Sequence, residues 1–215
     1  MQDRYHLDET RGPKPLPMHL AIAALFAADY DEREKGERCY VSMLAGMRRY
    51  YEHDAQRNTQ HLKTVTSLSS STIYAHKDLT PSHTKTQRPF LLIPSLINSP
   101  AILDILPDCS LLAYLNRCGI PAFLLDWGDI LCDPGLRDYT VIAKRLNGLV
   151  AQLKDKYNCN KVHGLGYCMG GHFLVAANAL APANYASLTF LGTPWDFAAS
   201  DYKLAQIVEL FSSAL

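Results

Sequence analysis

The sequence has no excess of charge of either sign, because 21 lysine and arginine residues balance 21 aspartate and glutamate residues. Surfaces that bind nucleic acids or anionic membranes rely on clustered positive charge, so this balance predicts neither partner. The apolar stretch of the N-terminal region, about residues 20–28, is shorter than a membrane span requires. The same region lacks the clean basic start of a signal peptide. We therefore expect a cytoplasmic protein with no transmembrane segment.

Cysteine motifs that bind metals are missing as well. The six cysteines show no C-x-x-C spacing and no histidine at the spacing of a zinc ligand. The sequence therefore predicts no metal site, and free thiols in a reducing compartment explain the cysteines. They are Cys39, Cys109, Cys118, Cys132, Cys159 and Cys168.

The 215 residues, 48% of them hydrophobic, are enough to bury one sizeable core. Short apolar runs indicate buried strands, and they alternate with helical patterns, which predicts an α/β fold with a mostly parallel, doubly wound sheet. Before them, residues 62–68 and 71–77 alternate in polarity and predict a β-hairpin. A polar arm over 1–17 and helices over 18–28 and 34–53 are expected to precede this core. The expected core elements are strands at 90–93, 121–127, 162–165 and 187–191 and helices at 110–118, 138–157 and 172–180.

Residues 166–170, Gly-Tyr-Cys-Met-Gly, have the spacing of a nucleophile elbow with cysteine as the nucleophile. A bare pattern of this kind also fits a small buried cysteine. Here a predicted strand enters it and a predicted helix leaves it, which is the context that the motif requires. Gly166 and Gly170 are explained by crowding, because a Cβ at either position would collide with backbone. Cys168 is therefore the candidate nucleophile.

Four stretches in order resemble the polyhydroxyalkanoate (PHA) synthases, a family of acyltransferases of the α/β-hydrolase fold that polymerise hydroxyacyl-CoA. The resemblance covers about residues 90–197 and implies that fold for this chain. The Asp-Trp-Gly and Gly-Tyr-Cys-Met-Gly-Gly sequences are most similar to the shorter catalytic subunits, which work with a second subunit. The four stretches are residues 164–171, 93–105, 124–128 and 193–197.

The resemblance implies that Cys168 attacks the thioester carbonyl of a hydroxyacyl-CoA and passes the acyl group to the hydroxyl of a growing polyester. The oxyanion would be held by the backbone N–H of Met169 and by that of Leu96 or Ile97. Coenzyme A enters as part of the substrate, and no other cofactor is expected. A second synthase subunit or a second copy of the chain is the expected protein partner, and the polyester granule is a further expected location.

The family's catalytic Asp and His follow later core strands, whereas this sequence ends at Leu215, 47 residues after Cys168. We therefore expect a helical N-terminal segment over 1–60 and, over 61–215, an α/β-hydrolase core that stops before the cap and these two residues. His163 lies inside a predicted strand and His172 on the elbow helix, so neither is well placed to take the Sγ proton. Asp126 ends a strand, where a structural hydrogen bond explains it better than catalysis.

Two other functions remain open at this stage. A cysteine-dependent hydrolase of esters or thioesters would use the same elbow with water as the acceptor, and residues near the elbow do not separate it from a transferase. The second alternative is an inactive half-domain that only binds a partner or a polymer granule. Such a half-domain would leave an apolar sheet edge uncovered and would self-associate.

Overall fold

The structure is a computed structural model, and it describes residues 41–46, 48–49, 52, 61–79, 88–96, 99–106, 108–129 and 132–196. The chain divides into two compact units, Arg57–Trp195 and Met1–Gln56 with Asp196–Leu215. In the latter, the described residues of the helix predicted over 34–53 are helical. The predicted arm over 1–17 and the predicted helix over 18–28 lie outside the described residues.

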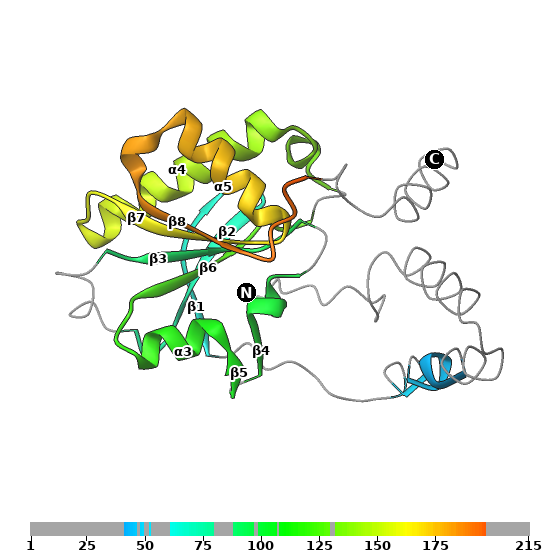
Figure 1. The fold of residues 1–215 in the computed structure, drawn as a ribbon. Coiled ribbons are helices and arrows are strands. Elements are labelled where there is room, and N and C mark those ends of the chain that lie inside the picture. The colour runs from blue at the N-terminus through cyan, green and yellow to red at the C-terminus, as the bar shows by residue number, and fades with distance from the viewer. Residues whose placement is uncertain are drawn as a thin grey trace. The chain divides into compact units, whose positions relative to one another are not determined.

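A six-stranded sheet forms the core of the unit Arg57–Trp195, in the order β1-β2-β6-β3-β7-β8 (Figure 1). The last four strands in this order run parallel, while β1 and β2 are antiparallel to their neighbours. The fold is therefore α/β with a mostly parallel sheet, as the sequence predicts. The strands are β1 (Leu62–Leu68), β2 (Ser71–His76), β3 (Phe90–Ile93), β6 (Ala122–Asp126), β7 (Val162–Tyr167) and β8 (Tyr185–Leu191).

The predicted hairpin is confirmed at the β1 edge of the sheet. In β2, buried Ser71, Ile73 and Ala75 alternate with half-buried residues, which is the period of a strand with one face on the core. The last residue of β2, His76, lies beside the residue that precedes β1. The His76 ring is half-buried and its centroid lies 5.5 Å from that of His61.

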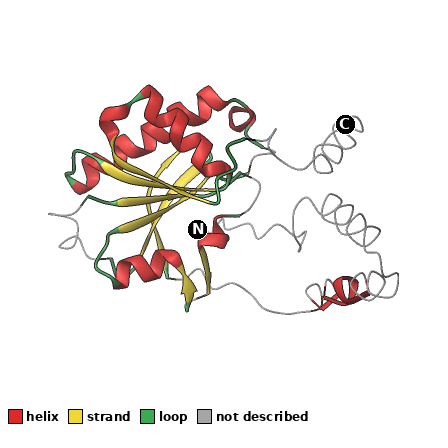
Figure 2. Ribbon diagram, viewed as in Figure 1, coloured by secondary structure: helices red, strands yellow, loops and turns green. Residues whose placement is uncertain are grey.

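Helices cover both faces of the sheet, as Figures 1 and 2 show. Helix α3 (Leu111–Arg117) lies on one face, and α4 (Tyr139–Tyr157) and α5 (Met169–Leu180) lie on the other. The three helices predicted for the core are confirmed, and α5 begins three residues earlier than predicted because the turn at Cys168 leads directly into it. Single turns of 3-10 helix complete the connections at Pro100–Leu103 (η2), Pro134–Arg137 (η3) and Pro182–Asn184 (η4).

The ends of α3 and α4 are set by local hydrogen bonds. Ser110 Oγ accepts the N–H of Ala113 at 2.9 Å, and Asp138 Oδ1 accepts the N–H of Thr140 at 2.6 Å. Such caps satisfy N–H groups that have no partner inside the helix. After α3, Gly119 has a φ of 77°, a left-handed conformation that stops the helix and favours glycine.

A second, two-stranded sheet follows η2 and was not predicted from the sequence. It pairs β4 (Asp104–Leu106) with β5 (Cys109–Ser110). The buried Asp104 anchors it, because one carboxylate oxygen accepts the Ser110 hydroxyl at 2.6 Å and the other lies 2.9 Å from His61 Nε2. This side-chain network ties the small sheet to the start of β1.

An ion pair between a buried arginine and a half-buried aspartate fixes the loop that leaves β6. Arg145, on α4, donates to both carboxylate oxygens of Asp133, with its Nη1 2.6 Å from Oδ2. The hydroxyl of Ser70 also donates to Asp133, at 2.6 Å. The hydrogen bonds from Arg145 and then from Ser70 hold the pKa of the Asp133 carboxyl well below its usual range.

We expect Asp133→Asn to lower the free energy of unfolding at pH 6, with the deficit shrinking as the pH falls. A carboxyl whose pKa is depressed in the folded state stabilises the fold above its unfolded pKa of about 3.9, and that stabilisation is lost as the pH falls toward its folded pKa. Urea unfolding of both proteins at pH 6 and at pH 3 checks this. An equal deficit at both values would contradict it.

Candidate active site

Cys168 lies in the turn between β7 and α5, where its backbone has φ 51° and ψ −127°. Non-glycine residues rarely adopt a positive φ, and a strained residue between a strand and a helix is the geometry of a nucleophile elbow. Two backbone hydrogen bonds hold the turn: the Cys168 N–H donates to the Leu191 carbonyl at 2.9 Å, and the Gly171 N–H donates to the Cys168 carbonyl at 3.0 Å. The turn thus presents a half-buried cysteine at the carboxyl end of a parallel strand.

The two glycines of the motif are required by close backbone contacts. A Cβ on Gly166 would lie 2.6 Å from the backbone nitrogen of Gly171 and still closer to its Cα. A Cβ on Gly170 would lie 2.7 Å from the Pro94 carbonyl oxygen and still closer to that of Ile93. In both cases the obstacle is backbone, which side-chain rotation does not relieve. The first turn of α5 therefore lies directly against β7 and against the end of β3.

Two of the three predicted oxyanion-hole residues can be placed. Met169 is the first residue of α5, where backbone N–H groups have no intrahelical partner. Leu96 follows β3, is half-buried and packs against the core, two residues beyond the Pro94 carbonyl that faces Gly170. Ile97 lies outside the described residues. The structure thus brings the loop that carries Leu96 to the first turn of α5.

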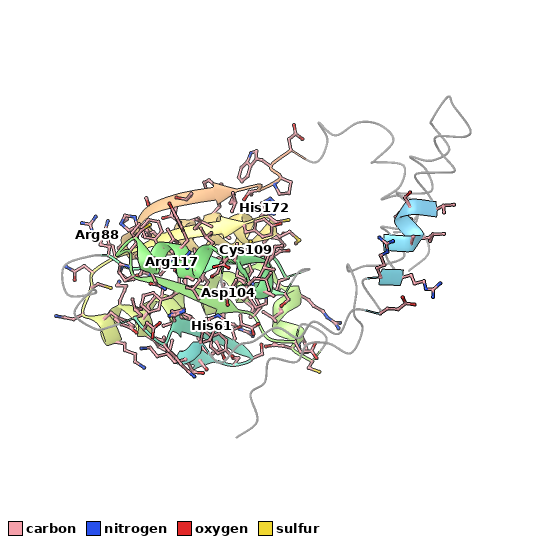
Figure 3. The ribbon with its side chains drawn as sticks, turned by 90° about the horizontal axis from the view of Figure 1, so that it is seen from below. His61, Arg88, Asp104, Cys109, Arg117 and His172 are labelled. Carbon is pink, nitrogen blue, oxygen red and sulfur yellow. The ribbon has the colours of Figure 1, made fainter. Side chains whose placement is uncertain are left out.

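His163 and His172 each contact a residue other than Cys168. His163 Nδ1 lies 2.7 Å from the Ser187 hydroxyl, and its ring stacks on Phe90. Burial, with a smaller contribution from the positive charge of Arg88, lowers the pKa of His163. His172 Nε2 contacts the Pro194 carbonyl oxygen. Figure 3 shows His172 well separated from His61, which is paired with Asp104.

Asp126 has a local structural contact of the kind expected from the sequence. Its Oδ1 accepts the N–H of Gly128 at 3.0 Å, and Gly128 has a φ of 80°. This bond shapes the turn after β6. The aspartate therefore holds the loop that carries Trp127 and Gly128.

The described residues include neither a cluster of metal-ligating side chains nor a membrane-spanning helix. In this part of the chain, no group of three or more His, Cys, Asp or Glu side chains could hold a metal ion. No described helix is long and apolar enough to cross a membrane.

Similar sequences include two proteins named poly(3-hydroxyalkanoate) polymerase subunit PhaC. The one from Haloferax mediterranei is 34% identical over 110 residues, which are 50% of this chain and 22% of that protein. The one from Allochromatium vinosum is 32% identical over 122 residues, which are 56% of this chain and 34% of that protein. The chain thus spans about a fifth to a third of the length of these relatives.

Among solved structures, an epoxide hydrolase from potato aligns with 69% of this chain and 46% of its own, at a TM-score of 0.48 and 12% identity. No protein-family model matches the sequence.

Proposed function

We propose that this chain, a homologue of the poly(3-hydroxyalkanoate) polymerases over about half of its length, is an acyltransferase whose nucleophile is Cys168. The observation that supports this most directly is the backbone of Cys168, which has a positive φ in the turn from β7 into α5. A cysteine needs no such strain to fill a core. Strain of this kind persists where the surrounding structure over-determines it, and it clusters at active sites.

The proposed substrate is a hydroxyacyl-CoA thioester. Sγ of Cys168, as the thiolate, forms a bond to the thioester carbonyl carbon. The bond from that carbon to the sulfur of coenzyme A then breaks, and coenzyme A leaves as the free thiol with the proton that a base had taken from Cys168. In the second step, the hydroxyl oxygen of a growing polyester attacks the acyl-cysteine. The new ester forms, its hydroxyl proton passes to a base, and the Cys168 thiolate is regenerated.

Both steps pass through a tetrahedral intermediate with a negative oxygen, which backbone N–H groups would stabilise. We assign these donors to Met169 and to Leu96, whose segments meet where Gly170 faces Pro94. Because His163 lies inside β7 and His172 lies on α5, neither is well placed to take the Sγ proton, and we assign the base to another residue of the chain or to a partner chain.

The decisive experiment incubates the full chain with 3-hydroxybutyryl-CoA and measures free coenzyme A, polymer and free acid. We expect release of coenzyme A, an acyl group on the Cys168 peptide by mass spectrometry, and insoluble polyester. Free 3-hydroxybutyrate in place of polymer would overturn the transferase in favour of a hydrolase. No release, with and without a polymerase partner subunit, would leave the chain as a binding module and contradict the proposal.

A further inference from the structure

Trp127, directly after β6, is only 2% exposed, and neighbouring residues contact both its backbone and its ring. Its backbone carbonyl oxygen accepts the hydroxyl proton of Ser71 and lies equally close, at 3.0 Å, to the hydroxyl oxygen of Ser70. Its ring meets Phe173 of α5 edge-on, with centroids 5.5 Å apart. Trp127 is thus held between the β1–β2 turn, through its backbone, and the elbow helix, through its ring.

The indole N–H of Trp127 donates to the Pro94 carbonyl oxygen at 2.9 Å in the buried interior. Pro94 ends β3 because proline has no N–H to donate to a neighbouring strand. A buried carbonyl that loses its partner is left with the full cost of its desolvation. The indole therefore fixes the peptide that leaves β3.

The same carbonyl lies against the first turn of α5, where it would be 2.7 Å from a Cβ on Gly170. Leu96, the proposed oxyanion donor of the loop, comes two residues later. Trp127 therefore reaches the proposed oxyanion hole through Pro94, although it is 41 residues from Cys168 in sequence and touches no proposed donor.

We infer that Trp127 is a positioning residue for the oxyanion hole: its indole N–H holds the Pro94 carbonyl so that the N–H of Leu96 is set against the elbow. This inference rests on the proposed function. The positioning role requires the hydrogen bond from the indole N–H to the Pro94 carbonyl, which a merely buried aromatic ring would not need. A phenylalanine would still bury a ring against Phe173 and would leave the Pro94 carbonyl without this donor.

The first test compares Trp127→Phe with the natural chain in two reactions of the same sulfur. Acylation by 3-hydroxybutyryl-CoA develops an oxyanion, whereas alkylation of Cys168 by iodoacetamide develops none. Removing an oxyanion donor outright costs about 100- to 1,000-fold. For displacement of the donor we expect acylation to slow by about 10- to 100-fold, while alkylation changes by less than about twofold. Equal changes in the two rates would overturn the inference and indicate a purely structural role.

The matched control is Trp195→Phe, because Trp195 is the other tryptophan of the chain and is 72% exposed. This variant should change neither rate. In the NMR spectrum of the natural chain, one indole N–H should be protected from exchange, and Trp127→Phe should remove that signal. Two rapidly exchanging indole signals would contradict the buried hydrogen bond.

A second readout does not depend on catalysis. In Trp127→Phe, we expect the backbone amides of Ser95 and Leu96 to exchange with solvent at least about tenfold faster, while the amides of β6 keep their protection. If the natural chain releases no coenzyme A, the proposed function fails and this localised change still supports the positioning. Unchanged exchange at Ser95 and Leu96 overturns the positioning, whatever the activity.

Discussion

Replacing Cys168 with alanine is expected to abolish the release of coenzyme A from 3-hydroxybutyryl-CoA. The reason is chemical, because a methyl group can form no bond to the thioester carbonyl and the acyl-enzyme route is closed. Removal of a nucleophile leaves only binding and oxyanion stabilisation, and losses of about 1,000-fold or more are typical. The fold should persist, because an alanine in this turn has the same backbone strain that Cys168 already has. Chromatographic measurement of free coenzyme A checks the rate, and circular dichroism checks the fold.

A matched control tests whether replacing any half-buried cysteine, and not Cys168 in particular, lowers the release of coenzyme A. Cys159, in the connection from α4 to β7, is half-buried like Cys168, and burial raises the pKa of its thiol. A thiol kept protonated is a poor nucleophile. Cys159→Ala should therefore keep coenzyme A release within about twofold of the natural chain. Release by Cys168→Ala at the natural rate would refute the assignment of the nucleophile.

The local elements were accessible from the sequence because each is encoded within a short window. The alternation in residues 71–76 reports one buried face of a strand. The spacing of Ile142, Leu146, Leu149 and Leu153 reports the buried face of α4. The order of strand, Gly166, Cys168 and helix likewise places the candidate nucleophile by local rules alone.

The contacts that support the site could not be predicted in this way, because they join residues far apart in the chain. Asp104 meets a histidine 43 residues earlier, and the indole of Trp127 meets a carbonyl 33 residues earlier. No period or spacing encodes such a pair, since each partner alone is an ordinary polar group near the end of an element. The second sheet was missed for a related reason, because its strands have only three and two residues and show no alternation.

Replacing Gly170 with alanine is expected to reduce both stability and coenzyme A release. In an ordinary helix this change stabilises by about 0.5–1 kcal/mol, because glycine loses more backbone entropy on folding. Here the added Cβ would lie 2.7 Å from the Pro94 carbonyl oxygen and still closer to that of Ile93. Backbone must move to admit it, and overpacking of this kind costs about 1–3 kcal/mol. We therefore expect a net destabilisation, measured by urea unfolding of the full chain.

The effect on the reaction should exceed the effect on the fold, because the displaced carbonyls belong to the segment that leads to Leu96. We expect release of coenzyme A to fall by at least about tenfold under conditions where the variant remains folded. Gly148→Ala is the matched control, since its Cβ would meet only the Leu68 Cδ2 methyl, the end of a flexible side chain. That variant should be as stable as the natural chain or more stable, with unchanged release. If Gly170→Ala behaved in the same way, the first turn of α5 would have room beside β3, and the argument for a tightly packed elbow would be wrong.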